Sequence, residues 1–328
     1  MIRRRDFITL LGGAVAAWPL AAPGQQATPV IGYLGISSPE PFASRLQAFR
    51  HGLSETGYVE GRNVKIDYRW AENQFDRLGV LASDLVNHRP STIVAAGSIA
   101  GALAVKAATT TIPIVFETGA DPVASGLVPS LSRAGGNITG VTSLNIEVSP
   151  KRLELLHELI PNARVVALLV NPAQPSITQL LLPQMQAAAQ SLGIELHILQ
   201  ASGVSELESV FARLAQLGAD GLVVSSEPFF NSRNAQLGTL GLRYGVPTIS
   251  QSREFAVAGG LASYGGSVTE SHRLTGHYAG RVLKGEDPAN LPVQQSTKVE
   301  LIINLKTAKT LGITVPLPLS GRADELIE

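Results

Sequence analysis

From about Val30 onward, the sequence alternates short, continuous apolar runs with amphipathic stretches. This alternation is typical of parallel β-strands joined by crossover helices. The runs are too continuous for strands with one solvated face, so we expect helices on both faces of each sheet. They form two sets of similar spacing: 30–36, 64–70, 92–96, 113–116 and 138–141, then 165–170, 194–199, 221–225, 246–249 and 261–264.

Two sets of strands predict two similar α/β lobes, each Rossmann-like with a parallel sheet, joined by a hinge and separated by a cleft. The length of 328 residues also favours two domains over one or three. We place lobe 1 at 28–145 plus about 268–296, and lobe 2 at 146–267 plus about 297–328. The chain then crosses between the lobes three times.

Helix starts are indicated by capping residues and prolines. Ser38 and Pro39 predict the first helix, Ser149 opens the helix after the first lobe, and Ser205 with Glu208 forms a capping box. Near the C-terminus we expect a helix at 272–283, a strand at 298–304, a helix at 305–311 and a surface tail at 315–319.

Composition and motifs exclude several classes of function. Lys plus Arg and Asp plus Glu number 26 each and are scattered after residue 5, so we expect no nucleic-acid partner. The chain has no Cys, no Walker A lysine and no G-x-S-x-G elbow, and Gly97–Gly101 lacks the full dinucleotide pattern. His272 and His277 are five apart, which does not place two ligands on one helical face. We predict no enzyme, metal or cofactor.

The N-terminus has the layout of an export signal. Arg3-Arg4-Arg5-Asp6-Phe7-Ile8 precedes an apolar stretch at 10–20, and small residues Ala22 and Gly24 precede a predicted cut before Gln25. The twin arginines resemble a twin-arginine signal. A retained anchor is the alternative, but the apolar run is shorter than the ~20 residues of a spanning helix. Residues 1–24 therefore predict a cleaved signal peptide and a periplasmic protein.

Candidate ligand-binding residues follow the predicted strands, because ligands of open parallel sheets lie beyond the carboxyl ends of the strands. Hydroxyls and helix N-termini there suit a carboxylate, and Asp121 or Glu227 suits an ammonium. An apolar ligand body could pack on Phe42, Phe229 or Tyr264. The candidates are Ser37, Ser98, Thr118, Asp121, Asn171, Glu227 and Tyr264.

Each candidate also has a purely structural interpretation. Ser, Asp and Asn at strand-to-helix junctions commonly serve only as N-caps, and Glu227 could stabilise a helix dipole in solvent. Tyr264, beside two glycines, could pack at the hinge, and Phe42 lies on an apolar helix stripe that favours a core position.

Long segments resemble the substrate-binding proteins of ABC transporters of the tryptophan/tyrosine type. They include 4–8, 121–128, 135–141, 253–265, 283–285, 291–293, 303–309 and 322–325. Gly24 and Gly266 depart from the family pattern, in which alanine and proline or a bulkier residue are usual. The resemblance implies a type I periplasmic-binding fold, a ligand between the lobes, and a membrane permease and an ATPase as partners.

The leading hypothesis is a monomeric solute-binding component of an ABC importer, which captures an amino acid, aromatic ones included, or a related carboxylate by hinge closure. A periplasmic sensor domain that acts through a partner receptor is the alternative. A nicotinamide-linked enzyme is a third reading, which the incomplete glycine pattern disfavours.

Overall fold

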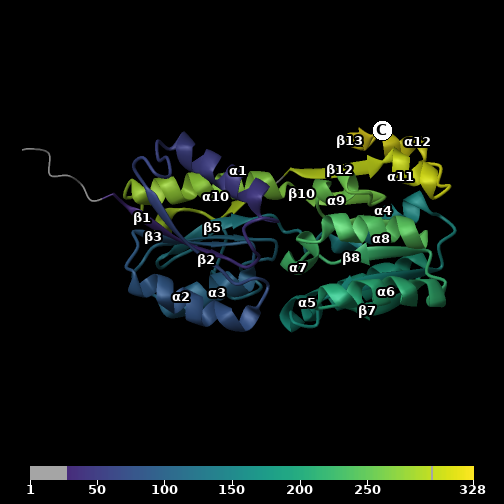
Figure 1. Cartoon of the computed structure of the whole chain (residues 1–328), viewed down its shortest axis with the longest axis horizontal. Coiled ribbons are helices and arrows are strands. Elements are labelled where there is room, and N and C mark those ends of the chain that lie inside the picture. Colours follow the sequence, from purple (N-terminus) through teal and green to yellow (C-terminus); the bar gives the residue numbers. More distant parts are fainter. Residues whose placement is uncertain (1–27, 297) are drawn as a thin grey trace, which may run out of the picture.

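The computed structural model describes residues 28–296 and 298–328, and it consists of two α/β lobes that lie side by side (Figure 1). The predicted signal peptide at 1–24 lies outside these residues. Within the described part of the chain, no helix has both the length and the apolar character needed to cross a lipid bilayer.

Lobe 1 is built around a six-stranded sheet with the order β11-β5-β4-β3-β1-β2, in which every neighbouring pair is parallel. Its strands are β1 (Val30–Gly35), β2 (Lys65–Trp70), β3 (Thr92–Ala96), β4 (Ile114–Thr118), β5 (Ile138–Thr142) and β11 (Gln294–Gln295).

Lobe 2 is built around a seven-stranded sheet with the order β13-β12-β10-β9-β8-β6-β7. Its pairs are parallel except β10 with β12, which is antiparallel. The strands are β6 (Val165–Val170), β7 (Glu195–Gln200), β8 (Gly221–Val224), β9 (Thr248–Ser250), β10 (Ala262–Gly266), β12 (Val299–Asn304) and β13 (Glu325–Ile327).

Five strands in each lobe follow the same spatial order, so β2-β1-β3-β4-β5 corresponds to β7-β6-β8-β9-β10. The predicted fold class of two lobes with parallel-dominated sheets is thereby confirmed. Apolar residues on alternate sides of one strand join different core clusters: on β6, Ala167 and Leu169 pack in one cluster and Val166 and Leu168 in another. Both faces of this sheet are therefore covered, as the continuous apolar runs predicted.

The helices connect the strands in the crossover pattern expected of parallel sheets. In lobe 1, α1 and α10 lie together on one side of the sheet and α2 and α3 on the other (Figure 1). The helices of lobe 1 are α1 (Ala43–Glu55), α2 (Leu78–Asn87), α3 (Ile99–Ala108) and α10 (Val268–Leu283), with 3-10 turns at Phe75–Arg77 and Pro288–Asn290. Those of lobe 2 are α4 (Ser149–Leu159), α5 (Pro175–Leu192), α6 (Val204–Leu217), α7 (Pro228–Asn231), α8 (Asn234–Tyr244), α9 (Arg253–Val257), α11 (Leu305–Thr310) and α12 (Leu317–Ser320).

Two predicted helix caps were wrong. The chain from Pro39 to Phe42 closes a turn through a Phe42 N–H bond to the Pro39 carbonyl, and α1 begins only at Ala43. In α6 the side chain that caps is Glu206, which accepts from the amide of Ser202. Glu208 instead accepts from Arg243 on α8.

The C-terminal prediction also needs correction. α10 begins at Val268, four residues before the predicted start, because the Ser267 hydroxyl caps it by accepting from the amide of Glu270. The predicted surface tail at 315–319 is right in part: Leu317 is 86% exposed, but α12 forms there and buries Leu319, which is 1% exposed. The prolines at 316 and 318 predict an irregular tail because they interrupt the local sequence pattern. The chain beyond them nevertheless returns to the sheet of lobe 2, where β13 pairs with β12.

Glycines bring α1 and α10 unusually close together. A Cβ on Gly276 of α10 would collide with the carbonyl oxygen of Phe49 on α1, and a Cβ on Gly52 of α1 would collide with the carbonyl of Arg273 on α10. Backbones can approach this closely only where no side chain intervenes. The contact lies in the second half of α1 and the middle of α10, and it packs the two helices directly against each other beside the sheet of lobe 1.

Within the described residues, three connections cross between the lobes: β5 to α4, β10 to α10, and β11 to β12. Asn145 joins the first two, because its Oδ1 accepts from the amide of Gly266 at 2.7 Å. The fully buried Arg152 of α4 donates Nε to the carbonyl of Tyr264 and Nη2 to the carbonyl of Asn145. The buried side chains of Asn145, on the first crossing, and of Arg152, in lobe 2, thus link the first two connections by hydrogen bonds.

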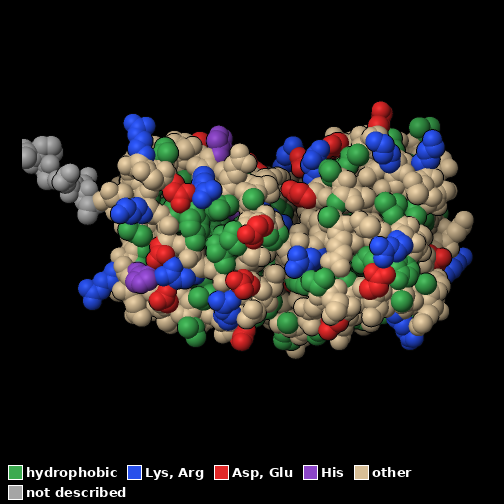
Figure 2. Space-filling view, viewed as in Figure 1, with side chains coloured by type: hydrophobic (Ala, Val, Ile, Leu, Met, Phe, Trp, Pro, Cys, Tyr) green, Lys and Arg blue, Asp and Glu red, His purple; other side chains and the backbone are tan. Residues whose placement is uncertain are grey.

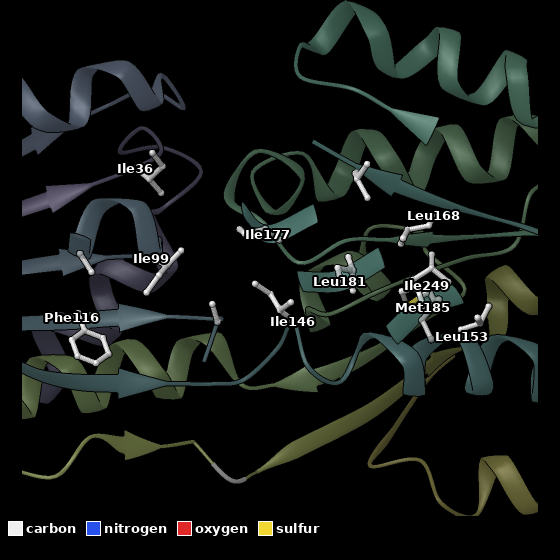
Figure 3. Close-up of a cluster of buried hydrophobic side chains, with 14 of the residues drawn as sticks. Ile36, Ile99, Phe116, Ile146, Leu153, Leu168, Ile177, Leu181, Met185 and Ile249 are labelled. Atoms are coloured by element: carbon white, nitrogen blue, oxygen red, sulfur yellow. The ribbon is translucent and has the colours of Figure 1, made fainter. Parts of the chain in front are cut away.

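The apolar core continues from one lobe into the other. A single cluster of buried side chains includes Phe116 and Ile99 of lobe 1 and Ile177 and Leu181 of lobe 2 (Figure 3). Ile146, on the first crossing, belongs to the same cluster. The buried apolar cluster therefore includes side chains of both lobes and of the first crossing between them.

Candidate functional site: the cavity between the lobes

A cavity with about 460 Å³ of empty space, part of it open to solvent, lies between the two lobes. In the space-filling view, charged side chains of both signs lie near the boundary between the lobes (Figure 2). From lobe 1, its lining includes Arg45, Gly97–Ile99, Glu117–Ala120, Val268 and His272; from the first crossing, Ser143, Asn145 and Ile146; and from lobe 2, Ile177, Ser226–Pro228, Asn231 and Gln251.

Most of the residues that line the cavity lie in segments that follow the carboxyl ends of parallel strands. Lobe 1 contributes the segments that follow β3, β4 and β5, and lobe 2 contributes those that follow β8 and β9. This is the expected position for a ligand site of open α/β sheets. The cavity differs from a single-lobe site because both sheets face it.

Three of the predicted residues line the cavity: Ser98, Thr118 and Glu227. Each is also engaged with the backbone. The Ser98 hydroxyl accepts from the amide of Ala100 at the start of α3, and the Thr118 hydroxyl accepts from the amide of Ala120. These side chains therefore stabilise the loops at the strand ends and also line the cavity.

The other four predicted residues do not line this cavity. Asp121 accepts from the amides of the turn that follows it, and Asn171 donates Nδ2 to Glu227 at 3.1 Å. Tyr264 packs against the apolar cluster, and its carbonyl accepts from Arg152. Ser37 is buried, and its hydroxyl has no partner among the described residues.

Glu227 is a buried carboxyl that serves as the N-cap of α7. Oε1 accepts from the amide of Phe230 at 2.8 Å, and Oε2 accepts from the amide of Phe229 at 3.2 Å and from Asn171. Burial raises the pKa of Glu227 to about 7, against the opposing effect of these hydrogen bonds. Both oxygens are thus already hydrogen-bonded within lobe 2.

Arg45 is a cavity residue that the sequence did not identify. It lies in the first turn of α1, is 8% exposed, and places its guanidinium 5.1 Å from the ring centroid of Phe42. Burial lowers its pKa, opposed by the more distant charges of Glu254 and Glu117. Among residues 28–296 and 298–328, no carboxylate forms an ion pair with it within 4.0 Å. The search for strand-end residues missed it because it lies on a helix.

Glu117 and His272 form a second group that the sequence did not identify. Glu117 Oε2 accepts from the amide of Gly97 at 3.0 Å and lies 3.6 Å from His272 Nε2. Burial raises the pKa of Glu117 to about 7 and lowers that of His272 to about 3. Glu117 was missed because its strand runs to Thr118, two residues beyond the predicted end, and His272 because its helix starts earlier than predicted.

Charged and polar side chains make up most of the lining of this cavity, and Ile99, Ile146, Ile177 and Val268 contribute aliphatic surface. Among the described residues, no group of three or more His, Cys, Asp or Glu side chains is placed to hold a metal ion. The arrangement provides a cation, two carboxyls, an imidazole and several hydroxyls and amides around one space. Such a set can bind a small molecule that carries both charges.

A family profile described as ABC transporter substrate binding protein matches residues 36–327. The chain belongs to this family of substrate-binding proteins. A relative described as a tyrosine-binding protein, from Clostridioides difficile, is 29% identical to it over 274 residues, which are 81% of this chain and 76% of the relative.

Two solved structures place this substrate-binding protein among neighbours with the same architecture. A conserved domain protein from Vibrio cholerae matches with a TM-score of 0.82 and 26% identity, over 91% of this chain and 99% of that one. An ABC domain from Streptococcus pneumoniae, in complex with L-Trp, matches with a TM-score of 0.80 and 25% identity, over 92% of this chain and 100% of that one. The predicted family resemblance and fold are both confirmed.

Proposed function

We propose that this chain is the solute-binding component of an ABC importer and that it captures an L-amino acid between its lobes without changing it chemically. The observation that carries the proposal is the interlobe cavity, which is lined from both lobes and holds an unpaired guanidinium together with buried carboxyls. The similarity to a tyrosine-binding protein and to a domain solved with L-Trp favours an aromatic amino acid.

The binding assay is a thermal shift of the mature chain against the twenty L-amino acids, followed by calorimetric titration. A ligand at 100 times its Kd adds about 2.7 kcal/mol to the free energy of unfolding, because it binds only the folded state. We expect tyrosine or tryptophan to give the largest shift. If none of the twenty L-amino acids changes the melting temperature, the proposed function is wrong.

We also propose that the lobes close around the ligand as two bodies, 28–145 with about 268–296 and 146–267 with about 297–328. The three crossings and the small number of residues in each support a hinge. Small-angle scattering with and without the amino acid that binds would test closure. A radius of gyration that is unchanged at saturation would argue for a rigid site.

Delivery to an importer requires a protein outside the cytoplasmic membrane, so we propose periplasmic export by the signal at 1–24 and transfer to a permease and an ATPase. The support is the sequence around Arg4 and Arg5. Fractionation of cells that express the full chain and the Arg4→Lys, Arg5→Lys variant tests export. We further expect a monomer in sedimentation.

A further inference from the structure

Two buried acceptor atoms face each other in lobe 1. His272 Nδ1 lies 2.8 Å from the carbonyl oxygen of Val268, which can only accept, so Nδ1 carries the proton of the neutral ring. Nε2 is then an acceptor, and it has no hydrogen-bond partner among the described residues. Glu117 Oε2 lies 3.6 Å from it. A donor that reached both atoms would satisfy the unpaired nitrogen.

A cation without a counterion lies near this acceptor pair. Arg45 lines the same cavity, and Glu117 is one of the charges that act on it from beyond ion-pair distance. A buried guanidinium with no carboxylate partner is costly unless a ligand supplies the charge. Lobe 1 therefore presents an acceptor pair and an unmatched cation to one space.

We propose that lobe 1 binds the head group of the amino acid: the α-ammonium donates to Glu117 Oε2 and His272 Nε2, and the α-carboxylate pairs with Arg45. Lobe 2 then closes over the ligand side chain. This inference rests on the proposed function and deepens it by assigning the residues that recognise an α-amino acid.

The alternative ammonium sites are less suitable. Glu227 has both oxygens engaged by the amides of α7 and by Asn171, so an ammonium there would compete with an existing cap. Asp121 does not line the cavity, and one of its oxygens caps the turn that follows. Glu117 accepts one backbone bond, from Gly97, and retains free acceptor capacity.

Binding of an ammonium must favour the ionised form of Glu117. The groups that face this carboxyl are Tyr33 from β1, Arg45 from α1, His272 from α10 and the amide of Gly97. In the free protein, burial holds the pKa of Glu117 at about 7. The ammonium lowers this pKa, so binding releases a proton at pH 6 and releases almost none at pH 8.

The test compares L-tryptophan and L-tyrosine with their des-amino analogues, indole-3-propionate and 3-(4-hydroxyphenyl)propionate, by calorimetric titration. Loss of one charged hydrogen bond changes affinity by about 10- to 100-fold. We expect Glu117→Gln to weaken binding of the amino acid by this factor and to leave the affinity for the des-amino analogue unchanged. The matched control is Glu72→Gln, an exposed glutamate of the same lobe whose side chain is 59% exposed, and it should bind all four compounds as the wild type does.

Equal losses for the amino acid and its analogue in Glu117→Gln, or no loss, would overturn the head-group assignment and leave the proposed function standing. Absence of binding by any of the twenty L-amino acids would overturn both. A second measurement compares the wild type with Glu117→Gln by titration at pH 6 in two buffers of different ionisation enthalpy, because Glu227 lines the same cavity and also has a pKa raised to about 7. Release of a proton by the wild type but not by Glu117→Gln supports the assignment, and equal release by both proteins contradicts it.

Discussion

The two lobes share a strand order but use charge differently at the cavity. After the third strand of each lobe, a side chain caps the next helix: Ser98 in lobe 1 and Glu227 in lobe 2. In lobe 2 the carboxylate that lines the cavity, Glu227, accepts the hydrogen bonds of this cap. In lobe 1 a neutral hydroxyl makes the cap, and the carboxylate, Glu117, lies inside β4 with acceptor capacity to spare.

The same contrast separates the two buried arginines. Arg152 of lobe 2 donates to four oxygens, three of which belong to Asn145, Tyr264 and Ser226. Arg45 of lobe 1 has no ion-pair partner among the described residues. The difference teaches that burial alone does not mark a ligand-binding charge. A charge whose hydrogen bonds are already made holds the fold, and one whose hydrogen bonds remain unmade is available to a ligand.

The largest expected effect comes from Arg152→Met. The change removes the Arg152 donor of the Tyr264 carbonyl and one of the two side-chain donors of the Asn145 carbonyl. Each buried polar group left without a partner costs about 1–3 kcal/mol. We expect that decrease in the free energy of unfolding, measured by urea denaturation. If the melting curve is unchanged and only ligand affinity falls, Arg152 belongs with the ligand-binding charges and the contrast between the arginines fails.

Glu117→Gln should stabilise the ligand-free protein at high pH. The folded-state pKa of about 7 lies above the unfolded value of 4.5, so the wild type binds an extra proton when folded and loses stability as pH rises from 4.5 to 7. The loss is on the order of 3 kcal/mol. The amide carries no charge and has no such loss, and its oxygen can still accept from the amide of Gly97.

Urea denaturation at pH 5 and pH 8 measures this difference. The free energy of unfolding of the variant, relative to that of the wild type, should be larger at pH 8 than at pH 5. The lowered pKa of His272 destabilises both proteins as pH falls below 6.5, and it therefore largely cancels in the comparison. A variant that is less stable than the wild type at pH 8 would mean that the ionised carboxylate is well compensated in the free protein.

Arg45→Gln should separate binding from folding. Removal of the cation takes away the charge partner of the ligand carboxylate, and we expect affinity for the amino acid to fall about 100-fold. Because the guanidinium has no ion pair to lose, the free energy of unfolding should stay equal or rise. Calorimetric titration measures the affinity, and urea denaturation of the same sample measures the free energy of unfolding. A stability loss as large as that of Arg152→Met would show that Arg45 is structural.

The sequence predicts the strands, which depend on local apolar periodicity. It does not predict the cavity residues whose position depends on contacts between segments far apart in the chain. The strands at 92–96 and 165–170 match the observed bounds, because continuous apolar runs flanked by polar residues define buried strands locally. Ser98 and Glu227 were found because strand ends are visible in the sequence. Arg45 and His272 lie on α1 and α10, whose close packing depends on glycines far apart in the chain. No local pattern distinguishes these two side chains from solvated ones.

The smallest expected effect concerns the apolar contact between the lobes. Ile177, in the first turn of α5, lines the cavity and shares a buried cluster with Ile99 of lobe 1 (Figure 3). Ile177→Ala removes apolar area that is buried when the lobes are together, so the closed form should lose about 1 kcal/mol and ligand affinity should fall roughly fivefold. Leu180→Ala, on the same helix but 40% exposed, is the matched control and should change neither affinity nor scattering. If Ile177→Ala lowers the free energy of unfolding and leaves affinity as it was, this side chain belongs to the core of lobe 2 alone, and the lobes meet chiefly through the charged head group.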